Sequence, residues 1–206
     1  MTEICDRIRE HFHEQDRARE KAYNLSREVV RLASSCIKSV HRNQLQQAEQ
    51  LLSETCRATA EMVDAFSDQP ALRYGGFVGD AEKEYAEAAI TYAVIAGQSL
   101  PTPEQLEIDY APWLNGLAEV GGEFRRHVLD LIREDHPEQA EEYLEAMDEI
   151  YHTIMGFDYP NAISYGLRGR SDALRGMLER TRGDLTNALR QARLEQRLAQ
   201  MEERLP

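Results

Sequence analysis

The chain reads Glu84-Tyr85-Ala86-Glu87-Ala88-Ala89-Ile90-Thr91-Tyr92-Ala93-Val94-Ile95-Ala96 over residues 84–96, and this stretch decides the fold class. After Glu87 the stretch has almost no polar side chain, so a helix formed here has no solvent face and must be largely buried. Its apolar run is too short to span a bilayer, which needs about 20 such residues. We therefore expect a central buried helix in a helical protein.

Helical periodicity continues on both sides of this stretch, and no segment alternates in the manner of a strand. The sequence predicts an all-α fold: one domain over residues 1–206, built as a bundle of six or seven helices. A loop is expected over Ser67–Gly79, and a short helix at Thr102-Pro103, where a capping residue precedes proline. The long helices are expected from Glu3 or Asp16 to Val40, from a cap at Asn43 to Phe66, from Asp80 to Ala96, from Pro112 to Glu134, from Pro137 through Ile154, and from Arg170 to about Met201.

Two pairs of glutamates lie on these apolar helices. Glu84 and Glu87 are three residues apart, and Glu119 and Glu123 are four apart, so each pair occupies one helix face. If the two faces meet, four carboxylates converge, and they cannot all stay ionised without a cation between them. Carboxylate oxygens are the ligands of Mg²⁺, with Mn²⁺ the other candidate. This pattern predicts a metal-dependent hydrolase.

The alternative is that each pair is simply a solvated helix face, because similar spacings recur in this glutamate-rich chain. The local context separates the cases. The stretch 138–149 is crowded with acids, as a wet face would be, whereas the two candidate pairs are embedded among apolar residues. Charged groups are rarely buried without a partner, so a role in metal binding is favoured for Glu84, Glu87, Glu119 and Glu123.

Composition limits the class of protein. The formal net charge of −13 and the pI near 4.9 argue against a simple electrostatic binder of nucleic acid. Lys21, Lys38 and Lys83 are the only lysines, and such an acidic, lysine-poor chain suits concentrated salt, where screening is strong. A halophilic source is therefore a hypothesis, and it weakens the charge argument. Three widely spaced cysteines and no signal peptide favour a cytoplasmic location.

The C-terminal part of the chain is locally basic, with nine arginines and six acids from Leu167 onward. Such arginines can line a path for phosphates, and they can equally pair with acids on neighbouring helices. Apolar residues of the last helix recur at spacings of three and four, which suits a core stripe or a seam with another subunit. The nucleic-acid-binding candidates are Arg126, one turn after Glu123, together with Arg168 and Arg170.

With these motifs in place, the chain resembles the translin superfamily over nearly its whole length, and translin-associated factor X more than translin. Three segments carry the resemblance best: residues 21–28 with His41-Arg42, residues 84–88, and Asp109-Tyr110 followed by residues 116–126. Gly156-Phe157 also matches the segment before the family's last helix. The chain departs from the family by three extra residues before Gly116, by Glu119 in place of an aspartate, and by lacking translin's basic segment near residues 73–79.

The resemblance implies an all-α, translin-like domain and a Mg²⁺-dependent endoribonuclease that acts on single-stranded RNA. By position it assigns catalysis and metal binding to Glu84, Glu87, Glu119 and Glu123, and it implies a hollow octamer, here a homo-oligomer. Glu123 is a candidate general base, and Arg126 a candidate phosphate contact. Two other functions stay open: an all-α Mg²⁺-dependent nucleotide pyrophosphohydrolase, and a non-catalytic oligomer that binds single-stranded nucleic acid.

Overall fold

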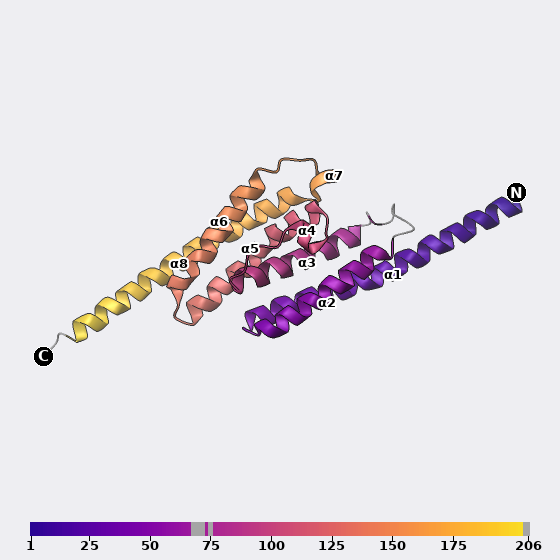
Figure 1. Cartoon of the computed structure of the whole chain (residues 1–206). Helices are drawn as coiled ribbons and strands as arrows, with labels where there is room; N and C mark the ends of the chain where they lie inside the picture. The colour runs from indigo at the N-terminus through magenta and orange to yellow at the C-terminus, as the bar shows by residue number, and fades with distance from the viewer. Residues whose placement is uncertain (67–72, 74–75, 204–206) are drawn as a thin grey trace. The chain divides into compact units, whose positions relative to one another are not determined.

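The structure is a computed structural model that describes residues 1–66, 73 and 76–203 (Figure 1). The described residues form helices and turns and include no strand, so the predicted all-α class is confirmed. Six of the helices in this part of the chain are long, in agreement with the expected bundle of six or seven. The chain divides into two compact units, Met1–Gly116 and Leu117–Pro206. The single domain expected over residues 1–206 stays a prediction.

The first unit is built on three long helices, of which α1 packs along both α2 and α3. Tyr85 and Ala89 of α3 meet Val29 of α1 and Met62 of α2 in a common apolar core. Because α3 is buried along most of its length, its position is fixed by this core. The elements of this unit are α1 (Thr2–His41), α2 (Leu45–Asp64), α3 (Gly76–Ile95), the short α4 (Pro103–Leu106) and the first turns of α5 (Tyr110–Arg133).

The second unit contains the rest of α5 and the C-terminal helices. α8 packs against α6, and Leu174, Leu178 and Leu185 of α8 are buried. These leucines belong to the predicted apolar stripe, which therefore faces the core of this unit. The elements that follow α5 are the 3₁₀-helix η2 (Pro137–Ala140), α6 (Glu141–Met155), the short α7 (Asn161–Ser164) and α8 (Leu167–Glu202).

Most predicted boundaries agree with the structure within a few residues, with three corrections. Asn43 does not cap α2; it has a φ of 55° in the turn after α1, a conformation that asparagine tolerates. Residues 76–79 of the expected loop belong to α3, whereas residues 67–72, 74 and 75 lie outside the described part. α8 begins at Leu167, three residues before the expected start. The short helix after Thr102 is confirmed, with a reciprocal capping box to Gln105.

Across the described residues, no helix combines the length and apolar character needed to cross a membrane.

Candidate functional site

The first glutamate pair lies on α3, the most deeply buried helix of the first unit. Tyr85, Ala86 and Ala88 around it are buried in the core. Glu87 is only 9% exposed, whereas Glu84 is partly open to solvent. One carboxylate oxygen of Glu84 and one of Glu87 lie within 4.8 Å of each other. The predicted pairing of these two side chains on one face is therefore present.

Lys83 supplies a positive charge directly beside this pair. Its Nζ donates to Glu84 Oε1 at 2.8 Å, and the residue is only 9% exposed. A buried ammonium is stable only when it is paired, which this contact provides. Lys83 has no role among the predictions from the sequence, and its position between Glu82 and Glu84 was the available signal.

A second buried acid on α3, Glu82, was also missed. Its side chain is 1% exposed, and burial raises its pKa to about 7, with the nearby charge of Asp109 adding to the shift. Arg73 lies 3.6 Å from Glu82 and donates to Asp109 at 3.3 Å, so it joins the two acids. The guanidinium of Arg73 and a backbone N–H of Asp109 both act to lower the Glu82 pKa, but burial prevails.

α5 approaches α3 at the point where the first pair lies. A Cβ atom placed on Gly116 would come 2.7 Å from Ala86 Cβ, 2.8 Å from the Lys83 carbonyl oxygen and 3.0 Å from the Glu87 amide nitrogen. The first two distances are shorter than real side chains show, and the third is at the tight limit. Gly116 is therefore required for the start of α5 to lie against the backbone of α3 within the first unit.

The second glutamate pair lies farther along α5, in the second unit. Glu119 accepts a hydrogen bond from Arg170 Nε at 2.7 Å, and both side chains are half-buried. Arg170 also donates through Nη1 to the Tyr165 carbonyl oxygen at 2.9 Å, so the guanidinium is held from two sides. Glu123 lies one turn beyond Glu119 and is partly exposed.

α5 and α8 pack closely beside this pair because the intervening residues are glycines. A Cβ atom on Gly121 would lie 2.2 Å from Leu174 Cδ1, so a larger residue at this position would force the Leu174 side chain or α8 itself to shift. Farther along, Arg125 donates to Thr181 at 3.0 Å and to Asp184 at 2.8 Å. The Gly121-Gly122 step thus lets α8 bring Arg170 to Glu119.

The arginines have different environments. Arg125 and Arg182 pair with Asp184 and Asp148 on neighbouring helices, as one of the two interpretations expected, whereas Arg175 pairs with Glu179 on its own helix. Arg170 is bonded to Glu119 as described above. Arg126 is exposed on α5, and Arg168 is exposed on the first turn of α8.

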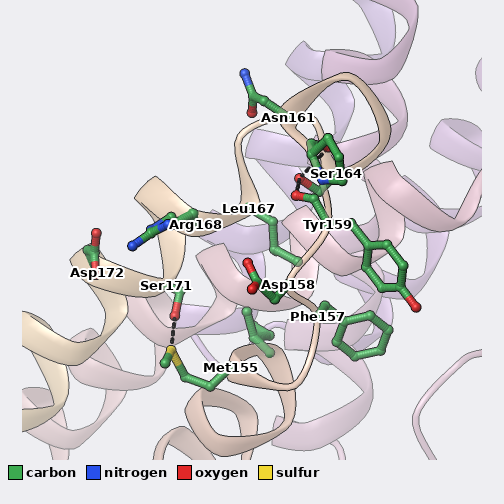
Figure 2. A pocket seen from close by; sticks show the side chains of 12 residues that line it. Met155, Phe157, Asp158, Tyr159, Asn161, Ser164, Leu167, Arg168, Ser171 and Asp172 are labelled. Atoms are coloured by element: carbon green, nitrogen blue, oxygen red, sulfur yellow. Dashed lines mark hydrogen bonds between the residues drawn. The ribbon is translucent and has the colours of Figure 1, made fainter.

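Arg168 lies on the edge of a groove of about 790 Å³ formed by the end of α6, the 156–160 turn, α7 and the start of α8. Figure 2 shows Phe157 and Tyr159 on the side of the groove opposite Arg168 and Asp172. Ser171, buried in its wall, donates to Met155 Sδ at 3.2 Å. Exposed aromatic rings in a groove that also carries an arginine are groups on which an unpaired base can stack. Arg168 is among the residues predicted from the sequence, whereas the groove is not predicted.

Each unit thus brings together part of the predicted site. Glu84 and Glu87 are paired in the first unit, and Glu119 and Glu123 follow one another on one side of α5 in the second. That all four carboxylates share one metal ion stays a prediction, as do the roles of Arg126, Arg168 and Arg170 in binding nucleic acid.

The chain is similar over most of its length to solved structures and to a further protein sequence. No protein-family model matches the chain. It is 33% identical to AfC3PO, whose structure is known alone and in complex with duplex RNA; the match covers 92% of this chain and 98% of AfC3PO, with a TM-score of 0.83. NeC3PO in its apo form shares the fold, with 18% identity and a TM-score of 0.81 over 89% of this chain and 96% of NeC3PO. MJ0175 of Methanocaldococcus jannaschii is 28% identical over 189 residues, which cover 91% of this chain and 83% of that uncharacterised protein.

Proposed function

The chain belongs to the translin superfamily, and from this premise we propose that it is a Mg²⁺-dependent endoribonuclease that cleaves single-stranded RNA. Glu84, Glu87, Glu119 and Glu123 are the proposed metal-binding and catalytic residues. The chain is proposed to act as a homo-oligomer, an octamer by analogy with the family.

The observation that carries the proposal is the burial of acidic side chains on α3. Glu87 is 9% exposed, and its carboxylate lies within 4.8 Å of that of Glu84. Two carboxylates held this close, one of them buried, repel each other, and a divalent cation bound between them would offset this repulsion. A helix that served only to form the hydrophobic core would carry apolar residues at these positions.

The position of Gly116 supports the inclusion of the second pair. Gly116 lies against the α3 backbone between Lys83 and Glu87. Glu119 and Glu123 come three and seven residues later on the same unbroken helix, and these spacings favour one face. We therefore assign both pairs to one metal site as part of the proposal.

The donor set suits Mg²⁺ or Mn²⁺, because all four residues offer hard carboxylate oxygens and two of these oxygens already lie near each other. When bound, the ion makes a water molecule more acidic and offsets the negative charge that develops on the phosphate. The glutamates would hold the ion. Glu123 is alternatively the general base that accepts a proton from the attacking water. Arg126, one turn after Glu123, would contact the phosphate.

RNA is the proposed substrate class because AfC3PO has been solved with duplex RNA and is 33% identical to this chain. Arg168 with Phe157 and Tyr159 offers a cation and aromatic faces in one groove, which suits an unpaired nucleotide. Such a groove would favour single strands, whose bases are free to stack.

A cleavage assay tests the proposal. The purified chain in high KCl is incubated with labelled single-stranded RNA, the matching duplex and single-stranded DNA, each with Mg²⁺, Mn²⁺ or EDTA. We expect metal-dependent cutting of the single-stranded RNA and its loss in Glu123→Ala. Normal cutting by a folded Glu123→Ala would refute the site assignment. Binding of RNA with no cutting in any metal would refute catalysis, and hydrolysis of nucleoside triphosphates in place of RNA would identify a pyrophosphohydrolase.

A further inference from the structure

Two of the four proposed metal ligands are already bonded to a cation of the chain itself. In the first unit, Lys83 Nζ donates to Glu84 Oε1 at 2.8 Å. In the second unit, Arg170 Nε donates to Glu119 Oε1 at 2.7 Å. Each glutamate pair thus has its own positive side chain, and the two contacts are made independently within their units.

Lys83 is an unusual residue in this chain. Only three of the 24 lysines and arginines are lysines, and the other two, Lys21 and Lys38, are exposed. Lys83 is 9% exposed, on a helix whose neighbouring residues are mostly core. An ammonium group at such a position is costly unless a nearby negative charge requires it. The contact with Glu84 provides that reason.

The guanidinium of Arg170 is fixed by two hydrogen bonds. Its Nη1 bonds to the Tyr165 carbonyl oxygen at 2.9 Å while its Nε bonds to Glu119. Tyr165 and Gly166 adopt φ values of 49° and 86° in the turn before α8, and this turn directs the Tyr165 carbonyl toward the guanidinium. The backbone therefore orients the guanidinium, and the guanidinium in turn orients the Glu119 carboxylate.

We propose that Lys83 and Arg170 are built-in counter-ions of the metal site and limit it to one divalent cation per chain. The inference rests on the proposed function, since it assumes that both glutamate pairs serve one site. Four carboxylates carry four negative charges, of which Lys83 and Arg170 offset two. A single Mg²⁺ or Mn²⁺ neutralises the remaining two, and a second ion would leave excess positive charge. Both residues act as positioning residues, because they orient and neutralise the ligands without contacting the reacting atoms.

Removing one of these cations should strengthen metal binding, which a purely structural role would not do. A divalent ion and a unit charge about 5 Å apart repel enough, even with the screening of water, to change affinity roughly tenfold. Lys83→Met and Arg170→Met keep much of the aliphatic side chain and delete the charge. We expect each to bind Mn²⁺ about tenfold more tightly than the unmodified chain, and the double variant to bind a second ion.

The experiment is a Mn²⁺ titration of the full chain, followed by the electron paramagnetic resonance signal of free Mn²⁺, which gives affinity and stoichiometry. Lys83→Arg and Arg170→Lys preserve the charge and should leave the affinity near that of the unmodified chain. Arg182→Met is the matched control, because it removes a salt bridge to Asp148 outside the site. Circular dichroism verifies folding, and Lys83→Gln and Arg170→Gln replace the methionine variants if these do not fold.

The outcomes separate this inference from the proposed function. One Mn²⁺ per unmodified chain, with tighter binding in the neutral variants alone, supports the counter-ion role. Equal or weaker binding in folded neutral variants overturns it, even if the unmodified chain binds Mn²⁺ and cuts RNA. Two ions bound to the unmodified chain also overturn it. Absence of Mn²⁺ binding by the unmodified chain refutes the metal-dependent function itself.

Discussion

At the scale of single residues, Glu82 shows how burial on α3 can control stability. Burial raises its pKa to about 7 from an ordinary value of 4.5. Between these two values the folded chain binds more protons than the unfolded chain, so the contribution of Glu82 to the free energy of unfolding falls as pH rises. Above pH 7 the full free-energy cost of burying the ionised Glu82 carboxylate is present, and it is on the order of 3 kcal/mol.

Replacement of Glu82 by glutamine should remove this dependence. We expect Glu82→Gln to be more stable than the unmodified chain at pH 8 and to differ little at pH 4.5, as measured by urea unfolding at both values. Glu61→Gln, at an exposed position on α2, is the control and should change neither. A loss of stability in Glu82→Gln at pH 8 would mean that the ion pair with Arg73 contributes more free energy than burial of the ionised Glu82 carboxylate costs.

Single residues also mark the limit of what the sequence predicts. The four glutamates stand out because their helices are otherwise apolar, and this contrast is visible in the sequence. The partners of Lys83 and Arg170 are not, because in a chain with 37 acidic residues each cation has many possible acids within reach. Arg170 is 51 residues from Glu119, and only the packing of α8 on α5 selects that pair.

At the scale of elements, helix contacts depend on glycines in α5. Gly116→Ala would place a methyl group 2.8 Å from the Lys83 carbonyl oxygen, and backbone cannot move aside as a flexible side chain can. We expect a loss of about 1–3 kcal/mol in the free energy of unfolding, as for other overpacked positions. Metal affinity should fall as well, because the same contact orients α5 beside Glu84 and Glu87.

Gly183→Ala is the matched control for this prediction. Gly183 lies in α8 with no atom within 4 Å of an added Cβ, so alanine should stabilise the helix by about 0.5–1 kcal/mol. Both changes are measured by urea unfolding, and metal affinity by Mn²⁺ titration. A Gly116→Ala variant as stable as Gly183→Ala would show that the contact with α3 is not a constraint.

The helices themselves were predictable, and their ends less so. Long apolar periodicity located all six long helices, because each buries one stripe against a core. The start of α3 was predicted too late because Gly76 and Gly79 suggest a loop, yet Val78 is buried in the core of the first unit and this packing supports a helical turn. Asn43 was misjudged as a cap because the same side chain also favours the left-handed turn that it adopts.

At the scale of the whole molecule, net charge predicts a response to salt. The formal charge of −13 creates repulsion within the folded chain that salt screens, with the Debye length falling from about 10 Å at 0.1 M to about 3 Å at 1 M. We expect the melting temperature to rise by several degrees between 0.1 M and 2 M KCl. Differential scanning fluorimetry measures this shift, and an unchanged melting temperature would remove the halophilic hypothesis.

Association into a homo-oligomer is the last expectation, and the helix ends suggest where it occurs. Ile4, Ile8 and Phe12 of α1 are 54%, 48% and 61% exposed, at a spacing of four residues. Near the other end of the chain, apolar side chains of α8 are again exposed at spacings of four and three: Leu194, Leu198 and Met201 at 58%, 51% and 65%. A repeated apolar stripe with this exposure is typical of a helix that packs against another chain.

We therefore expect Leu198→Glu to weaken association, because it places a charge in the middle of the exposed α8 stripe formed by Leu194, Leu198 and Met201. Light scattering coupled to size-exclusion chromatography should give a mass well above 23.6 kDa for the unmodified chain and a smaller mass for the variant. Gln196→Glu adds the same charge on the opposite side of α8 and should leave the mass unchanged. If both variants keep the full mass, the exposed α8 stripe is not part of the interface. The same measurement is then made on Ile8→Glu, in the exposed apolar residues of α1. A mass of one chain for the unmodified protein would instead refute the homo-oligomer, and with it the expected octamer.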